Sequence, residues 1–166
     1  LIFGVASEDS IAWAIAKQLH AAGATISLGY QQRFKSRILQ LVRGGDIPVE
    51  FYERCDVTNE EELDNFFDAY KGDIDILVHS IAYANPETFG QPISGVSQAH
   101  FAEALVTSSY SLLPLVRKAR PKLTKGSSVM TMTYLGGQRV VANYKLMGVA
   151  KAALEAVVRE LASDIG

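Results

Sequence analysis

Hydrophobic and polar positions along the chain predict strands and helices in alternation. Short apolar runs predict five strands, at residues 1–5, 24–30, 47–55, 74–80 and 127–134. Apolar residues at helical spacing predict helices at residues 10–22, 32–43, 58–70, 98–120 and 144–165. Strands alternating with helices of this length are typical of a parallel sheet with helices on both faces. The pattern therefore predicts an α/β fold with a doubly wound parallel sheet.

Capping and breaking residues predict where these elements begin and end. Thr58, followed three residues later by Glu61, has the pattern of a capping box. Pro114 predicts a bend or interruption in the helix over 98–120. Residues 84–95 and 136–143 are predicted loops. The inward faces of the first three helices are predicted from their apolar residues, which are Ile11, Ala14, Ile15, Leu19 and Ala22, then Phe34, Ile38, Leu41 and Val42, then Leu63, Phe66 and Phe67.

Right-handed crossovers in such a sheet predict a Rossmann-like strand order of 3-2-1-4-5. Ligands then bind at the carboxyl ends of the strands where the order reverses, so the residues after strands 1, 4 and 5 matter most. Residues 1–166 are predicted to form a single dinucleotide-binding domain, incomplete at both ends. The chain begins inside an apolar run and ends directly after a helix, which predicts an internal fragment, truncated before the last strands.

Composition narrows the classes of function. The 166 residues are 48% hydrophobic and 20% charged, which excludes disorder as the main state. A net charge of −2 gives no electrostatic reason to bind nucleic acid or an anionic membrane, and no apolar run approaches the roughly 18 residues of a membrane span. The single Cys55 excludes an internal disulfide and fits the cytoplasm. The three histidines have no partners at ligand spacing, so no metal site is predicted.

The turn after the first strand is a candidate phosphate site. Gly4 allows a sharp turn and a close approach of a ligand, and Ser10 can cap the next helix, whose N-terminus can hold a pyrophosphate. The segment is not G-x-G-x-x-G, and an ordinary strand-to-helix turn with a serine cap is the alternative.

The ends of strands 2 and 3 carry candidate nucleotide contacts. Gln31 can hydrogen-bond a ribose, and Arg33 or Lys35 can meet a 2′-phosphate, unless these basic residues are one solvated helix face. Asp56 can accept from an adenine amino group or serve as a turn residue. Small residues after strand 4 leave room for a ring, and His79 is interpreted as structural.

The strongest candidate chemistry lies at the start of the last helix. Tyr144 and Lys151 are seven residues apart, close to two helical turns, so both lie on one face. A lysine ammonium near a phenol lowers its pKa, and such a tyrosine can donate a proton or stabilise an oxyanion at a carbonyl. Tyr134, predicted to close strand 5, points to the same cleft. A core tyrosine and a surface lysine are the alternative.

Several motifs in one order carry a family resemblance. They are Gly4 with Ser10-Ile11-Ala12, Tyr30-Gln31, Cys55-Asp56-Val57, His79-Ser80-Ile81-Ala82, Ser109-Tyr110-Ser111-Leu112, Thr133-Tyr134-Leu135-Gly136, Asn143-Tyr144 and residues 147–156. Together they resemble NAD(P)H-dependent enoyl-acyl-carrier-protein reductases, a divergent branch of the short-chain dehydrogenases/reductases. Ordinary members carry Asn-Asn-Ala-Gly at 79–82 and a catalytic serine where this chain has Thr131, so both departures favour the enoyl branch. Lys145 stands where asparagine is common, and Ala142 where proline is common.

The resemblance implies a role for each candidate residue. Cofactor-binding residues would be Gly4, Ala6, Ser10, Ile11, Gln31, Asp56, Val57, Ser80, Ile81, Ala82 and Lys151. Catalytic residues would be Tyr144, Lys151 and Tyr134, and the substrate would contact Ala84, Tyr134, Tyr144 and Met147. The implied reaction reduces the trans-2 double bond of an enoyl thioester on acyl carrier protein, in fatty-acid synthesis.

Gln31, with no basic residue directly beside it, favours NADH as cofactor, while Arg33 leaves NADPH possible. The resemblance also implies a homotetramer. Family members have two further strands and a substrate-covering loop after the helix that ends this chain. A ketoacyl or other carbonyl reductase of the same superfamily and a non-catalytic dinucleotide-binding fragment remain alternatives. The basic residues Arg117, Lys118, Arg120, Lys122 and Lys125 can dock an acidic carrier protein or form a solvated helix end.

Overall fold

The computed structural model describes residues 1–166 and packs them as two compact units. The first unit comprises residues 1–80 and 116–131, and the second comprises residues 81–115 and 132–166. The first unit holds all five strands of the sheet, and the second is built from helices and the loops between them.

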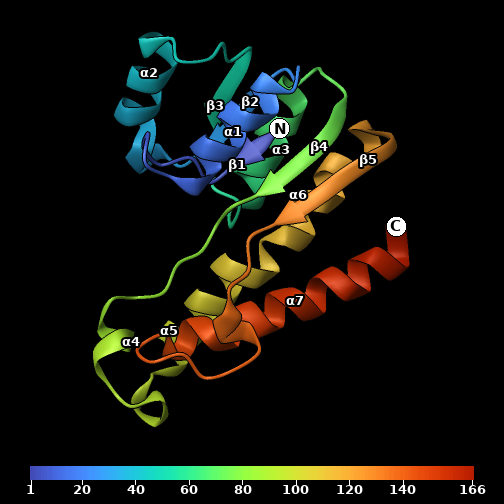
Figure 1. Cartoon of the computed structure of the whole chain (residues 1–166). Coiled ribbons are helices and arrows are strands. Elements are labelled where there is room, and N and C mark those ends of the chain that lie inside the picture. Colours follow the sequence, from blue (N-terminus) through green and yellow to red (C-terminus); the bar gives the residue numbers. More distant parts are fainter. The chain divides into compact units, whose positions relative to one another are not determined.

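The sheet of the first unit has the predicted topology (Figure 1). Its strands are β1 (Ile2–Phe3), β2 (Ser27–Tyr30), β3 (Phe51–Arg54), β4 (Ile74–His79) and β5 (Leu123–Thr131). All pairs are parallel, and the order is β3-β2-β1-β4-β5, which confirms the Rossmann-like prediction. The predicted boundaries are wrong for β5, which begins four residues earlier and ends at Thr131 rather than at Tyr134.

Helices cover both faces of this sheet because successive side chains of a strand point to opposite faces. Ile2 packs in a cluster with Trp13 of α1 (Ile11–Ala21) and Ile38 of α2 (Lys35–Gly44). The next residue, Phe3, lies on the other face, with its ring 5.0 Å from that of Phe66 in α3 (Glu60–Ala69). Burying an aromatic side chain of this size contributes roughly 2–3 kcal/mol. Residues 2 and 3 of β1 therefore connect the sheet to the helices on its two faces.

The predicted inward face is correct for α2 and α3 but partly wrong for α1. The buried residues of α1 are Ala12, Trp13 and Ala16, whereas Ile11 is 61% exposed. The pattern was ambiguous because alanines are frequent on both sides of this helix. The large indole of Trp13, which is fully buried, decides which side faces the sheet.

The capping prediction for α3 is wrong by one residue. Asn59, not Thr58, is the N-cap, and its side chain accepts from the backbone N–H of Glu62 at 3.2 Å. The hydroxyl of Thr58 instead donates to Asp56 Oδ1 at 2.7 Å. Because the hydroxyl of Thr58 bonds to Asp56, it does not cap the helix as the sequence pattern predicts.

The second unit contains α4 (Glu87–Gly90), α5 (Gln98–Leu105) and α7 (Lys145–Ile165), while α6 (Leu112–Ala119) runs from the second unit into the first. Single-turn helical segments lie at Gln32–Phe34, Ile93–Gly95, Arg120–Lys122 and Leu135–Gly137. The predicted loop over 84–95 therefore includes α4, whose four residues are too few to show a helical period in the sequence. No helix combines the length and apolar character that crossing a membrane requires.

The long helix predicted over 98–120 is interrupted, but not at Pro114. A π-helical turn, Val106–Tyr110, separates α5 from α6, and Ser111 N–H donates to Val106 O at 2.9 Å. Pro114 lies in the first turn of α6, where a helix leaves its N–H groups without intrahelical partners. The proline is accommodated because the chain widens one turn before it.

Candidate active site

The turn after β1 brings two predicted cofactor residues together in the first unit. Gly4 has φ +108°, and a Cβ there would lie 2.0 Å from the carbonyl oxygen of Ser80. Ser80 N–H in turn donates to Phe3 O at 2.9 Å. Only glycine fits this approach between the ends of β1 and β4, which is where the strand order reverses.

The N-terminus of α1 follows this turn and is capped as predicted. Ser10 Oγ accepts from Trp13 N–H at 3.4 Å and donates to Ser7 O at 2.7 Å. Ile11 and Ala12 begin the helix, so their N–H groups have no intrahelical acceptor and favour an anion. Ala6 is half-buried beside them. The geometry fits a pyrophosphate at this helix end.

Gln31 and Asp56 are joined by a hydrogen bond that sequence reasoning missed, although it selected both residues. Gln31 Nε2 donates to Asp56 Oδ2 at 2.9 Å, and Thr58 donates twice to Asp56 Oδ1. Burial opposes ionisation of Asp56, but the bonds from Thr58 and Gln31, with Arg33 nearby, hold its pKa below the ordinary value. Val57, the next predicted contact, is buried.

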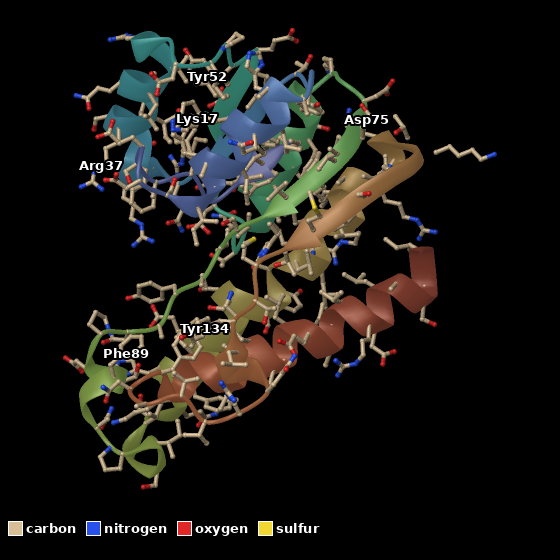
Figure 2. The ribbon with its side chains drawn as sticks, in the orientation of Figure 1. Lys17, Arg37, Tyr52, Asp75, Phe89 and Tyr134 are labelled. Carbon is tan, nitrogen blue, oxygen red and sulfur yellow. The ribbon has the colours of Figure 1, made fainter.

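A cavity of about 360 Å³ borders the turn between β1 and α1. Acidic side chains outnumber basic ones in its lining, which is formed by Ser7, Glu8, Asp9, Arg37, Gln40, Leu41, Gly44 and Asp46. Arg37 is labelled in Figure 2. Three carboxylates against one guanidinium make this cavity unfavourable for a phosphate group.

His79 has the structural role that the sequence predicts. Thr131 Oγ1 donates to His79 O at 3.0 Å, so its oxygen accepts from His79 Nδ1, also at 3.0 Å. This pair links β4 to β5. Thr131 stands where ordinary short-chain reductases carry the catalytic serine, and its hydroxyl hydrogen is used within the sheet.

Two members of the basic set are paired with acidic residues of α3. Arg117 donates to both carboxylate oxygens of Glu60, at 2.6 and 2.9 Å, and Lys118 pairs with Asp64. Exposed pairs of this kind contribute less than about 1 kcal/mol. They nevertheless direct these two charges to the chain's own helix rather than to a partner.

Tyr134 and Tyr144 meet in the second unit. Their ring centroids are 4.7 Å apart with an edge-to-face angle of 61°. Tyr134, labelled in Figure 2, is 49% exposed and lies three residues beyond the end of β5, in extended backbone. Tyr144 is half-buried and directly precedes α7. The predicted convergence of the two tyrosines is therefore confirmed, whereas the position of Tyr134 on a strand is wrong.

Two glycines hold Tyr144 in place, and sequence reasoning did not single them out. A Cβ on Gly136 would lie 2.2 Å from Tyr144 Cδ1, and one on Gly148 would lie 2.6 Å from Gly136 O. The ring thus packs directly on backbone. Both glycines belong to the motifs that carry the family resemblance. The spacing of residues along the sequence alone does not show that they pack against Tyr144.

Lys151 is nearly completely buried, with 4% exposure. Its Nζ donates to Met132 O at 2.6 Å, and burial lowers its pKa. The pKa of Tyr144 is raised, first by burial and then by the charge on an ionised Tyr134. The expectation that Lys151 lowers the pKa of Tyr144 is therefore wrong for this structure, because the ammonium is held by a backbone carbonyl.

The predicted substrate residues Ala84 and Met147 share one apolar cluster in the second unit. Buried Ala84, Ala104, Leu146 and Met147 pack with Val96, Leu105 and Tyr144. The segment before Ala84 is fixed by Tyr83 N–H, which donates to Ser108 Oγ at 2.9 Å. Of the remaining predicted cofactor contacts, Ile81 is half-buried and Ala82 is exposed.

The fold and the turn at the strand switch place the chain among α/β proteins with a Rossmann-like dinucleotide-binding sheet. Within that class, the chain belongs to the enoyl-(acyl carrier protein) reductase family, whose model matches residues 4–166.

Two named relatives show how far this similarity extends. The enoyl-[acyl-carrier-protein] reductase [NADH] FabI of Nostoc sp. is 43% identical over 173 residues, covering 100% of this chain and 66% of the relative. The protein of the same name from Bacillus subtilis is 40% identical over 170 residues, with the same coverage. The chain thus spans about 66% of the length of these relatives.

Solved structures agree with this assignment. The enoyl-(acyl-carrier-protein) reductase of Anaplasma phagocytophilum, in complex with NAD, matches with a TM-score of 0.93 at 37% identity, covering 99% of this chain and 64% of that one. The Bacillus cereus enoyl-acyl carrier protein reductase, with NADP+ and an indole naphthyridinone, matches with a TM-score of 0.94 at 41% identity, covering 99% and 65%. These similarities confirm both the fold and the family that the motifs predict.

Proposed function

We propose that this protein reduces the trans-2 double bond of enoyl-acyl-carrier-protein thioesters with NADH, in fatty-acid synthesis. The contact between Tyr134 and Tyr144 carries the proposal, with the buried Lys151 about two helical turns further along the chain. Relatives at 40% identity or more are named enoyl-[acyl-carrier-protein] reductase [NADH], which supports the same reaction.

Tyr144 has the properties of a hydrogen-bond donor to the substrate. Because its pKa is raised, its hydroxyl is protonated throughout the neutral range. When bound, NADH supplies a hydride to the β-carbon of the enoyl thioester. Tyr144 would stabilise the negative charge that develops on the thioester oxygen, and the α-carbon of the resulting enolate would take up a proton from solvent. A single hydrogen-bond donor to a developing oxyanion typically raises kcat about 10²–10³-fold.

The other residues in the second unit have supporting roles in this proposal. Lys151 would hold the hydroxyls of the nicotinamide ribose, while Ile81 and Ala82 would lie along the ribose and nicotinamide. Tyr134, Ala84 and Met147 border the acyl chain. The apolar cluster around Ala84 and Met147 supports this assignment, because an acyl chain requires an apolar wall.

The first unit fits the remainder of a dinucleotide. Gly4, Ala6, Ser10 and Ile11 form the turn and helix end suited to the pyrophosphate, next to Ser80. Gln31 faces the adenosine ribose, and Asp56 with Val57 lies at the adenine. The support for these roles is the backbone approach at Gly4, which a side chain would block.

The bond between Gln31 and Asp56 favours NADH over NADPH. A carboxylate only accepts hydrogen bonds, so Gln31 must direct its amide nitrogen to Asp56 and keep its amide oxygen for the ligand. That oxygen can accept from a ribose 2′-hydroxyl but not from an ionised 2′-phosphate. The ionised Asp56 repels a 2′-phosphate further.

The two alternatives from the sequence have weaker support. A ketoacyl reductase of this superfamily needs a serine donor, whereas Thr131 is bonded to His79. A non-catalytic dinucleotide-binding protein needs no contact between Tyr134 and Tyr144. A preference for ketoacyl over enoyl thioesters would distinguish the first alternative from the proposed enzyme. Cofactor binding without turnover would distinguish the second.

We further propose a cytoplasmic homotetramer in which residues 1–166 belong to one dinucleotide-binding domain. Exposed apolar side chains on α5 and α7, namely Phe101, Val149 and Val158, support an association between copies. Light scattering of the purified complete protein tests the assembly, for which the expected mass is four times that of one chain.

The function is tested by following NADH oxidation in the presence of a trans-2-enoyl thioester, with a 3-ketoacyl thioester and NADPH as controls. The proposal expects turnover with the enoyl substrate and NADH, and little with the ketoacyl substrate. Turnover with the ketoacyl substrate alone would establish the superfamily alternative. NADH binding with neither turnover would favour the non-catalytic alternative.

A further inference from the structure

Lys145 begins α7 against two local preferences. Its φ of +40° lies in the left-handed region, which residues other than glycine rarely adopt. Its ammonium also stands at the positive end of the dipole of a 21-residue helix whose first turn has no acidic residue. Asn143, with φ +65°, is the other non-glycine residue in this region, so the two flank Tyr144. Residues held against local preference often mark functional sites.

The side chain of Lys145 is directed to a different segment of the second unit. Its Nζ donates to Gln91 O at 2.5 Å in a partly buried contact. Gln91 directly follows α4, which packs against α7. A hydrogen bond from an ammonium is stronger than one between neutral groups, so this bond is suited to hold a short segment in place.

The segment over residues 84–90 contains its own hydrogen bonds. At its start, Asn85 Oδ1 accepts from Glu87 N–H at 3.1 Å, and Thr88 Oγ1 donates to Asn85 O at 2.7 Å. These bonds are local to the segment. Phe89, labelled in Figure 2, is 37% exposed. A helix of four residues is not stable alone. The buried Thr88 and the packing of α4 on α7 hold its middle, and the bond from Lys145 holds the residue that follows it.

The held segment begins at Ala84, in the apolar wall next to Tyr144. Ala84 packs with Leu146 and Met147, the two residues that follow Lys145, and Tyr144 precedes it. We propose that Lys145 is a positioning residue that fixes residues 84–91 against the start of α7 and so sets the acyl-binding wall relative to Tyr144. The acyl role rests on the proposed function, whereas the structural tie does not.

Hydrogen exchange of the complete protein tests the tie without substrate. Lys145→Met removes the donor, and backbone amides in residues 86–91 should exchange about tenfold faster, because a charge-assisted bond is lost. Lys145→Arg retains a long cationic donor and should restore most of the protection. Lys125→Met, at an exposed position of β5, is the matched control and should leave this segment unchanged.

Steady-state kinetics test the positioning role. Lys145→Met should raise KM for the enoyl thioester about five- to tenfold, change kcat less than threefold and leave the Kd for NADH unchanged. Lys145→Gly tests the alternative that the strained backbone, rather than the ammonium, matters, since glycine accepts φ +40° without strain. The proposal expects Lys145→Gly to resemble Lys145→Met.

Three results would overturn the inference. One is unchanged exchange of residues 86–91 in folded Lys145→Met, and another is wild-type kinetics in Lys145→Gly. The third is equal acceleration of exchange throughout the chain, which would indicate general destabilisation. If the unmodified protein reduced no enoyl thioester, the proposed function would fail, and the exchange experiment would still decide whether the tie exists.

Discussion

The two units differ in how their candidate residues are held. In the first unit, Gly4 and Gln31 lie directly after regular strands, and Ser10 caps the helix that follows the turn after β1. In the second unit, Tyr134 directly precedes the single-turn helix Leu135–Gly137, and Tyr144 lies between two residues with positive φ. The proposed cofactor residues are thus positioned by topology, and the proposed catalytic residues are positioned by local contacts. Changes in the first unit should mainly affect binding, and changes in the second should mainly affect rate.

Removing the hydroxyl of Tyr144 gives the largest expected effect on rate. Tyr144→Phe should lower kcat about 10²–10³-fold and leave the Kd for NADH within twofold, because it deletes a donor to the developing oxyanion. Stopped-flow turnover and a fluorescence titration of NADH measure the two quantities. Tyr110→Phe, at an exposed tyrosine of the same unit, serves as the control. Unchanged turnover in Tyr144→Phe would remove the catalytic role of this residue.

Gly4→Ala should be the most destabilising change in the first unit. The new Cβ meets Ser80 O and the backbone has φ +108°, so we expect a loss of about 2–4 kcal/mol in the free energy of unfolding and no measurable NADH binding. Gly44→Ala, at the end of α2 with open space around it, should be neutral or stabilising by up to about 1 kcal/mol. Equal urea midpoints for the two variants would contradict the close approach at Gly4.

Lys151→Met should separate stability from binding in the second unit. Burial lowers the pKa of Lys151, so methionine removes a charge that is costly to bury, and the melting temperature should not fall by more than a few degrees. The affinity for NADH should fall about tenfold with the loss of one charged hydrogen bond. Differential scanning calorimetry and the NADH titration measure the two effects, and an unchanged Kd would show that Lys151 is only structural.

The acid dependence of Asp56 gives the smallest effect. Its folded pKa lies below the ordinary value of 3.8, so its hydrogen bonds stabilise the fold above that pH and this stability is lost as the pH falls through the folded pKa. Asp56 is partly exposed, so the contribution is below about 1 kcal/mol. Asp56→Asn should therefore flatten the stability profile below about pH 4. A profile with the wild-type slope in urea titrations would contradict the lowered pKa.

Much of the first unit follows from sequence pattern. Apolar strand-length runs and right-handed crossovers predict the order β3-β2-β1-β4-β5. The glycine after the first strand and the serine before the first helix likewise predict the turn at Gly4 and the cap at Ser10. The errors arise where two residues compete for one role. Asn59 caps α3 because Asp56 takes the hydroxyl of Thr58, and Trp13 overrides the apolar face that begins at Ile11.

The second unit was harder to predict because its contacts are not periodic. Helical spacing places Tyr144 and Lys151 on one face of the last helix, but it cannot show that Met132 O accepts a hydrogen bond from the ammonium of Lys151. It also cannot show that Gly136 lies against the ring of Tyr144. These contacts join residues 8 to 19 positions apart through irregular backbone, for which the sequence has no repeating signal.

The destination of the transferred hydrogen tests the central claim most directly. The complete protein is supplied with NADH deuterated at the transferable position and a trans-2-enoyl thioester, and the product is analysed by mass spectrometry and NMR. The account predicts a saturated acyl thioester with deuterium at the β-carbon and a solvent-derived hydrogen at the α-carbon. No deuterated acyl product from the enoyl thioester, together with a β-deuterated 3-hydroxyacyl product from a 3-ketoacyl thioester, would contradict it.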